Sequence, residues 1–255
     1  MSSTDSIKRI KKLYDKRIES KNGVKAAGQW GSKELIPFIC EEICSKISIK
    51  NEHKILELGC GSGVLGSWIN LRCSHYVGLD LSSKMLNFFL KEADVERKPH
   101  LLQGITNMLP FLDDIFDVVT INGVTMYLNE ERILKQTLNE MKRVAKKNAL
   151  LFLGENIITS ELAWEFVWFQ NLAPIFQPLA KQYIKFRKWL AKKNPKLGGK
   201  WRYIYQDVSP DFIKNYFGES TNVTQSNSAA YTVRQKIKGK NYKGNKRVDF
   251  VIKLS

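Results

Sequence analysis

Hydrophobic and polar positions follow two alternating patterns from about residue 35 to residue 155. Short apolar runs rich in β-branched residues favour strands, and apolar residues three and four positions apart favour helices. Alternation of the two predicts a parallel sheet covered by helices on both faces. The expected helices are residues 35–48, 64–71, 82–93 and 130–145, and the expected strands are residues 54–58, 75–81, 101–103, 115–122 and 149–154.

Further elements are expected near the end of the chain. Ser209-Pro-Asp is typical of a helix start, and Gly218 is typical of a helix end. Two extended segments, residues 222–237 and 247–254, are separated by a basic stretch and predict an antiparallel pair at the sheet edge. The predicted fold class is therefore α/β, with a seven-stranded, mostly parallel sheet and an antiparallel last strand.

Residues 159–205 exceed what a minimal α/β sheet needs, and they are rich in aromatic side chains. We predict a helical insertion that covers the substrate, because so many aromatic groups outside the sheet need a surface to bury. Helical spacing of aromatic residues is also typical of ordinary core packing. The aromatic residues concerned are Trp164, Phe166, Trp168, Phe169, Phe176, Tyr183, Phe186, Trp189 and Trp201.

The net charge of +16 is concentrated in three segments. Residues 7–17, 181–202 and 234–247 hold 22 of the 41 basic residues and a single acid, Asp15. Such patches attract phosphates, nucleic acid or an anionic membrane surface, and each remains a possible partner. Solvated lysine-rich faces are the alternative. The oligomeric state is left open.

Composition bounds the location and the redox state of the protein. The polar start lacks the apolar run of a signal peptide, and no stretch approaches the ~20 apolar residues of a membrane span. Four cysteines without paired spacing do not indicate a disulfide framework. Cys40 and Cys44 share a helix face without further metal ligands, so we interpret them as core residues and expect no metal site. A cytoplasmic location is predicted.

A glycine-rich turn after the first expected strand is the candidate ligand-binding site. In Ile55-Leu-Glu-Leu-Gly-Cys-Gly-Ser-Gly63 the missing side chains let a ligand approach the backbone. Gly61-Ser-Gly-Val-Leu-Gly66, with Asp80 further on, also fits a nicotinamide or flavin dinucleotide site. Glu57 favours a different ligand, because a carboxylate repels a pyrophosphate and attracts an ammonium or sulfonium by ~1 to ~4 kcal/mol at about 4 Å. S-adenosylmethionine carries both cations and no phosphate.

Three sequence blocks together resemble the class I S-adenosylmethionine-dependent methyltransferases, in the branch that includes quinone-biosynthesis methyltransferases. The blocks are Glu57-Leu-Gly-Cys-Gly-Ser-Gly63, Gly78-Leu-Asp-Leu-Ser-Ser-Lys-Met-Leu86 and Gly104-Ile-Thr-Asn-Met-Leu-Pro-Phe-Leu-Asp-Asp-Ile-Phe-Asp-Val-Val119. The resemblance covers residues 54–155 and, more weakly, 209–254. It implies a Rossmann-like fold in a single domain, residues 1–255. Residues 1–34 would form a basic helix and a cofactor-covering segment, residues 35–158 and 206–255 the core, and residues 159–205 the insertion.

The resemblance also implies which residues bind the cofactor. The glycines of the turn would line the methionine part and the ribose, Glu57 would hold the amino group, and Asp80 would accept both ribose hydroxyls. Leu81 and Met85 would flank the adenine, and Trp30 would touch the cofactor or merely anchor its own loop. The implied cofactor-binding residues are Trp30, Glu57, Gly59, Cys60, Gly61, Gly63, Asp80, Leu81, Met85, Gly104, Ile105, Thr106 and Asn122.

One residue departs from the family pattern at the adenine end. The family usually has an acid after the glycine of the third block, where this chain has Ile105. The adenine amino group must then find another acceptor, for which Asn107 and a backbone carbonyl are candidates. Backbone amides near Thr106 would serve the adenine ring nitrogen.

Candidate catalytic residues follow from the strand ends, since ligands in open α/β sheets bind at the carboxyl ends of strands. Tyr127, after the fourth strand, and Glu155, after the fifth, are the candidate general bases. Positioning without a dedicated base is the alternative. His53, His75 and His100 lie near strand beginnings, at the wrong end of the sheet.

The expected activity is methyl transfer from S-adenosylmethionine to an oxygen, nitrogen or carbon atom of a small molecule, with S-adenosylhomocysteine as the product. Acidic, phosphorylated and lipid-like acceptors are all open. The main alternative is an RNA methyltransferase that uses the basic and aromatic patch. A catalytically silent binding protein is a third interpretation, against which the intact Glu57, glycines and Asp80 count.

Overall fold

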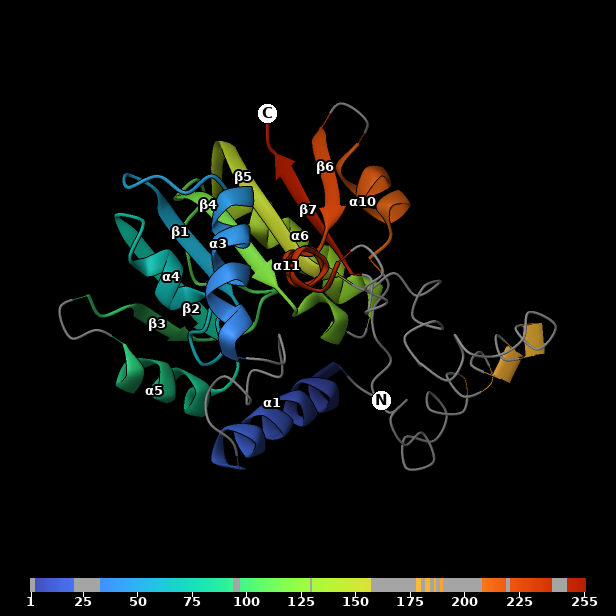
Figure 1. Cartoon of the computed structure of the whole chain (residues 1–255), viewed down its shortest axis with the longest axis horizontal. Helices are drawn as coiled ribbons and strands as arrows, with labels where there is room; N and C mark the ends of the chain where they lie inside the picture. Colours follow the sequence, from blue (N-terminus) through green and yellow to red (C-terminus); the bar gives the residue numbers. More distant parts are fainter. Residues whose placement is uncertain are drawn as a thin grey trace.

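The computed structural model describes residues 3–20, 33–93, 97–128, 130–156, 208–218, 221–239 and 247–255, with isolated helical positions between 178 and 189. The strands are β1 Lys54–Leu58, β2 His75–Asp80, β3 His100–Gln103, β4 Phe116–Asn122, β5 Ala145–Asn156, β6 Asn222–Asn227 and β7 Val248–Lys253. They form a sheet in the order β3-β2-β1-β4-β5-β7-β6 (Figure 1). Strands β1 to β5 are parallel, β7 is antiparallel to β5, and β6 is antiparallel to β7. The predicted fold class is confirmed.

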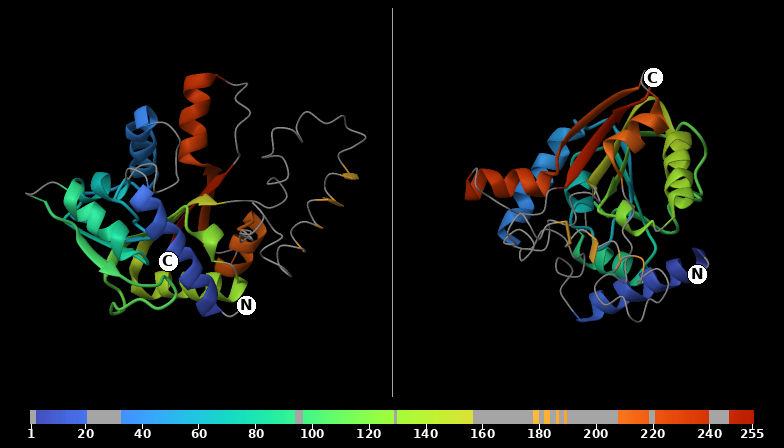
Figure 2. Two further views of the ribbon diagram at one scale, coloured as in Figure 1. Left: turned by 90° about the horizontal axis from the view of Figure 1, so that it is seen from below. Right: turned by 90° about the vertical axis from the view of Figure 1, so that its right-hand side faces the viewer.

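Helices cover both faces of this sheet (Figure 2). On one face pack α3 Ile36–Lys46, α4 Gly66–Asn70, α5 Ser83–Glu92 and α11 Ala229–Lys238. On the other face pack α6 Glu131–Val144 and α10 Pro210–Phe217. Neighbouring residues of one strand pack on opposite faces of the sheet. Ile55 lies in the core beneath α3, α4, α5 and α11, and Leu56 lies in the core beneath α6 and α10. Two short 3-10 helices, η1 Lys33–Leu35 and η2 Thr125–Tyr127, complete these elements.

The segment 222–237 is not extended throughout, which corrects the sequence-based prediction. Strand β6 ends at Asn227, and Ser228 caps α11 by accepting a hydrogen bond from the Tyr231 backbone N–H. Ala230 and Val233, three positions apart, are buried on the face of α11 that packs in the core. The predicted antiparallel pair at the sheet edge is present, but it is formed by the shorter β6 and by β7.

The basic N-terminal segment forms helix α1, Ser3–Ser20. Viewed from below, α1 crosses in front of the sheet and lies beside α5 (Figure 2, left). Within the described part of the chain, no helix combines the length and the apolarity needed to cross a membrane. The four cysteines are buried free thiols, and Cys40 and Cys44 pack in the core. Most of residues 159–205 lie outside the described residues, so the aromatic insertion and the domain division stay predictions.

Candidate active site

The turn after β1 is shaped by glycines in the left-handed region. The φ angle of Gly59 is +75°, and its N–H donates to the Leu79 carbonyl at 2.6 Å, which ties the turn to β2. A side chain at Gly59 would collide with Val124, because the loop after β4 passes directly beside the turn. β1 lies between β2 and β4, so this turn sits at the topological switch point, where open α/β sheets bind ligands.

Asp80 ends β2 and organises the loops on both sides of it. One carboxylate oxygen accepts a hydrogen bond from the Gly61 N–H at 2.8 Å, and the other accepts from the Ser82 N–H at 2.8 Å. Burial raises the pKa of Asp80, although these backbone hydrogen bonds favour the carboxylate and lower it. Each oxygen has a second lone pair, so the carboxylate can still accept two vicinal hydroxyls.

Glu57 lies in β1, below the glycine turn, and is only 3% exposed. The Tyr76 hydroxyl donates a hydrogen bond of 2.6 Å to Glu57 Oε2. Burial raises the pKa of Glu57 to about 7, outweighing the Tyr76 hydrogen bond, which lowers it, while Asp80 adds a smaller upward shift. Glu57 has no cationic partner among the described residues, and a buried carboxylate in this position is suited to a positively charged ligand.

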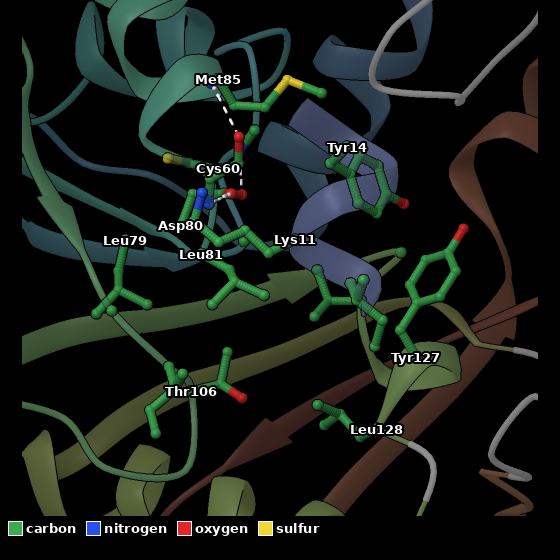
Figure 3. Close-up of a pocket in the computed structure, with 18 of the residues that line it drawn as sticks. Lys11, Tyr14, Cys60, Leu79, Asp80, Leu81, Met85, Thr106, Tyr127 and Leu128 are labelled. Atoms are coloured by element: carbon green, nitrogen blue, oxygen red, sulfur yellow. Dashed lines mark hydrogen bonds between the residues drawn. The ribbon is translucent and has the colours of Figure 1, made fainter. Parts of the chain in front are cut away.

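The turn, Glu57 and Asp80 open into one cavity at the carboxyl ends of the strands (Figure 3). This cavity, the donor cavity below, gathers residues from three separate sequence blocks and from η2. The predicted site residues that line it are Glu57, Gly59, Cys60, Gly61, Asp80, Leu81, Met85, Gly104, Ile105, Thr106, Asn122 and Tyr127. Trp30 lies outside the described residues. As predicted, His75 and His100 begin β2 and β3, and His53 precedes β1, at the opposite end of the sheet.

Two predicted site residues do not line the donor cavity. Gly63 instead makes room for the core, since a side chain there would collide with the buried ring of Phe89. Glu155 has a φ of +58° at an irregularity in the pairing of β5 with β7. That turn directs its carboxylate to Arg247, 3.4 Å away, and not to the cavity. The structure therefore does not bring Glu155 to the place that its predicted role as a base requires.

Helix α1 supplies a wall of the donor cavity, and its lining residues were not among the predicted site residues, although residues 1–34 were expected to include a cofactor-covering segment. Ile7, Ile10, Lys11 and Tyr14 of α1 line it, opposite the glycine turn. The Ser82 hydroxyl donates to Asp15 of α1, beside the backbone N–H that binds Asp80. The apolar spacing of residues 7, 10 and 14 is the sequence signal for this face of α1. The many lysines on the other face instead favour an anionic partner.

Tyr14 and Tyr127 meet across the cavity (Figure 3). Their rings pack edge to face with centroids 5.7 Å apart. Burial raises the pKa of Tyr14 well above its usual value, and the neighbouring Tyr127 adds to the effect. Tyr14 is therefore a neutral phenol near pH 7 and not a general base. Arg17 lies over the outer side of the Tyr14 ring, with its guanidinium carbon 5.1 Å from the centroid.

At the opposite end, the third sequence block follows β3. Gly104, Ile105, Thr106 and Asn107 all line the cavity. The Asn107 Nδ2 donates to Gln136 Oε1 at 3.2 Å. The Asn107 amide oxygen is therefore the atom available to accept a hydrogen bond from a ligand. The Thr106 hydroxyl is bound to Thr137 at 3.0 Å, so its backbone is the part suited to contact a ligand.

A parallel sheet with this order and a glycine turn at its switch point defines a Rossmann-like protein that binds a nucleoside cofactor. Comparison with known proteins identifies the family more closely. Residues 56–153 match the family described as "Methyltransferase domain", and they form a class I S-adenosylmethionine-dependent methyltransferase domain, as the three sequence blocks predict.

Individual relatives agree with this family. The ubiquinone/menaquinone biosynthesis C-methyltransferase UbiE of Vibrio vulnificus is 27% identical over 61% of this chain and 57% of its own length. The chain spans about half the length of such curated relatives, 41% of one and 57% of another.

Two solved structures share the fold. One is a phosphoethanolamine N-methyltransferase from Haemonchus contortus, with a TM-score of 0.66, 14% identity, and coverage of 99% of this chain and 50% of the other. The second is the magnesium protoporphyrin IX methyltransferase of Synechocystis PCC 6803, with a TM-score of 0.61, 12% identity, and coverage of 97% and 99%. Both were solved with S-adenosylhomocysteine bound.

Proposed function

We propose that this chain transfers the methyl group of S-adenosylmethionine to a small, largely apolar acceptor held between α1 and η2. The observation that carries the proposal is the cavity in which the glycine turn, the buried Glu57 and the half-buried Asp80 meet an apolar wall. The curated relatives that act on quinone precursors are consistent with such an acceptor.

The residues of the donor cavity fit S-adenosylmethionine, which supplies an electrophilic methyl group when bound. Glu57 would hold the ammonium group, since a buried carboxylate gains most from a cation in low dielectric. Asp80 would hold the ribose hydroxyls, and the residues around Ile105 would enclose the adenine. Because Gly61 carries no side chain beside Asp80, the backbone can approach the donor closely.

The acceptor side of the cavity is mostly apolar. Among the residues that the structure describes, Lys11 is the only cation in its lining, and it is paired with Asp15 at 2.6 Å, so the described lining offers little positive charge to a phosphorylated or acidic acceptor. The tyrosine pair offers aromatic edges and hydroxyls that orient an apolar molecule with one polar end. Orientation is the main contribution that we assign to these residues. The apolar side chains concerned are Ile7, Ile10, Val124, Leu128 and Ile133.

Donor affinity is expected to depend on the protonation of Glu57. Because the pKa of Glu57 is about 7 in the free protein, and a bound ammonium favours the carboxylate, affinity should rise as pH increases from 6 to about 7.5. Titration calorimetry in buffers of different ionisation enthalpy should detect proton release on binding. Glu57→Gln should bind more weakly and lose the pH dependence; a slope that persists in this variant would assign it to another group.

The raised pKa also affects the stability of the free protein. Folded Glu57 keeps its proton to a higher pH than unfolded glutamate, whose pKa is 4.5, so this residue lowers the free energy of unfolding as pH rises from about 4.5 to about 7. Glu57→Gln should remove this component, which thermal melts at several pH values would measure. If the stability of Glu57→Gln depends on pH in the same way as that of the wild type, Glu57 is not the source of this effect.

Tyr14→Phe is expected to lower kcat/KM for the acceptor by about three- to tenfold, the value of one hydrogen bond of 0.5–1.5 kcal/mol. Affinity for S-adenosylmethionine should change little, because the Tyr14 hydroxyl points toward Tyr127 (Figure 3). Tyr216→Phe, which alters a surface hydroxyl on α10, is the matched control. Equal losses in both variants would show that Tyr14 has no specific role.

The proposed acceptor class can be tested with a donor that carries a radioactive methyl group. The protein is incubated with this donor and with a cell extract separated into lipid, polar-metabolite and RNA fractions. Label should enter the lipid-soluble fraction, and it should do so in wild type but not in an Asp80→Ala variant. Label confined to RNA or to phosphorylated metabolites would overturn the apolar-acceptor proposal.

A further inference from the structure

A second hollow lies at the other end of the sheet, remote from the donor cavity. It is formed where α3 ends, where β1 and β4 begin, and where the chain turns within β5. We call it the basic hollow, and its volume is about 190 Å³. In Figure 1, α1 and the C-terminus mark these two opposite ends of the molecule. The polar residues that line the basic hollow are Ser48, Lys50, His53, Asp117, Lys146, Lys147, Asn148 and Lys253.

The charges around the basic hollow are unbalanced. Asp117 is the only acid in its lining within the described part of the chain, and both its oxygens are engaged: one accepts from the Lys146 ammonium at 2.8 Å and the other from the Lys54 backbone N–H at 2.8 Å. Lys50, Lys147 and Lys253 take part in none of the ion pairs found among the described residues.

Several lysines elsewhere on the described surface do pair with acids. Lys46, Lys84, Lys135 and Lys236 each contact an Asp or Glu side chain. Three ammonium groups that surround one hollow repel one another, and this repulsion is relieved when an anion enters. The basic hollow therefore gathers three lysines that can bind an anion without first leaving an acidic partner among the described residues.

Uncharged donors line the same space. The Ser48 hydroxyl and the Asn148 amide are exposed side chains in the lining, and both residues occupy the left-handed region, with φ of +48° and +62°. Ammonium, hydroxyl and amide donors that line one hollow from separate elements suit a phosphate group, which presents several strong acceptor oxygens. We propose that the basic hollow is an anion site that binds a phosphate group, independently of methyl transfer.

The test uses pyrophosphate as the probe, with S-adenosylhomocysteine present at saturation so that the donor cavity is filled. Calorimetry at low salt should show binding of pyrophosphate to the wild type. The double variant Lys147→Gln with Lys253→Gln should bind it about tenfold more weakly, because two charges near the ligand are lost. The matched control, Lys98→Gln with Lys214→Gln, removes the same charge from surface positions outside the hollow and should bind like the wild type.

The outcomes separate the proposal from general electrostatics. Absence of pyrophosphate binding while S-adenosylhomocysteine fills the donor cavity, or equal weakening in the control variant, would overturn it. A short single-stranded oligoribonucleotide distinguishes the source of the phosphate. If its binding depends on Lys147 and Lys253 more steeply than that of pyrophosphate does, the phosphate belongs to a nucleic acid. If only pyrophosphate depends on them, it belongs to a small molecule. Unchanged melting temperature and donor affinity in the double variant would show that the fold is intact.

Discussion

Replacing Asp80 with alanine is expected to reduce affinity for S-adenosylmethionine by about a hundredfold or more, because two hydrogen bonds to a charged group, each worth about 1.5–3 kcal/mol, are lost. The variant also releases the Gly61 and Ser82 amides that Asp80 holds, so the turn loses its shape as well. Calorimetric titration with S-adenosylmethionine would measure the change. An affinity close to that of the wild type would refute the assignment of the ribose to Asp80.

A second ligand separates direct contact from loss of loop shape. The 2′-deoxy analogue of S-adenosylhomocysteine lacks one hydroxyl that Asp80 is proposed to bind. In the wild type it should bind more weakly than S-adenosylhomocysteine. In Asp80→Ala the two ligands should bind equally, because the carboxylate that would contact the missing hydroxyl has been removed. If the deoxy analogue loses the same affinity in both proteins, Asp80 shapes the turn without touching the ribose.

Gly63→Ala is expected to lower the free energy of unfolding by about 2–5 kcal/mol, the sum of a left-handed backbone penalty and overpacking against a buried ring. The φ angle of Gly63 is +82°, and an added methyl group would overlap Phe89, which is 1% exposed in the core. Denaturant unfolding would measure the loss. Adding Phe89→Leu should recover part of it, and no recovery would mean that the ring is not the cause.

Gly61→Ala is the matched control, because the two glycines differ in what surrounds them. An added methyl group at Gly61 meets no described atom within 4 Å, so only the left-handed penalty of about 1–2 kcal/mol should appear in stability. Donor affinity should fall by about tenfold, since the methyl group would occupy space beside Asp80 that the donor needs. A donor affinity unchanged from wild type would place the ligand away from this part of the turn.

Local sequence patterns were sufficient for most of the sheet. The expected strands at residues 54–58, 75–81 and 115–122 match β1, β2 and β4 within a residue. Ser82, predicted as an N-cap from its position before α5, accepts the Met85 N–H as a cap should. These features depend on contacts between residues close in the chain, so they can be recognised without knowing the fold.

The segment 222–237 combines residues that favour a strand with residues that favour a helix. Residues 222–237 contain β-branched residues near both ends, yet only the first six form a strand, because Ser228 starts a helix whose apolar face packs beside α3. Asp249 of β7 also stabilises that helix start by accepting the Ala229 N–H at 2.9 Å. A partner twenty residues away decides the outcome, and no local pattern reveals it.

The sequence by itself determined the class of the protein: alternating strand and helix patterns, a glycine turn, and the acids Glu57 and Asp80 at the ends of adjacent strands. These features are encoded within short segments, and parallel strands necessarily bring their carboxyl ends to one edge. Only the tertiary structure decided that α1 lies over this edge, that Tyr14 meets Tyr127, and that Glu155 turns toward Arg247. Each of these depends on which surface a helix packs against, or on an irregularity between paired strands, and both are set by residues distant in the chain.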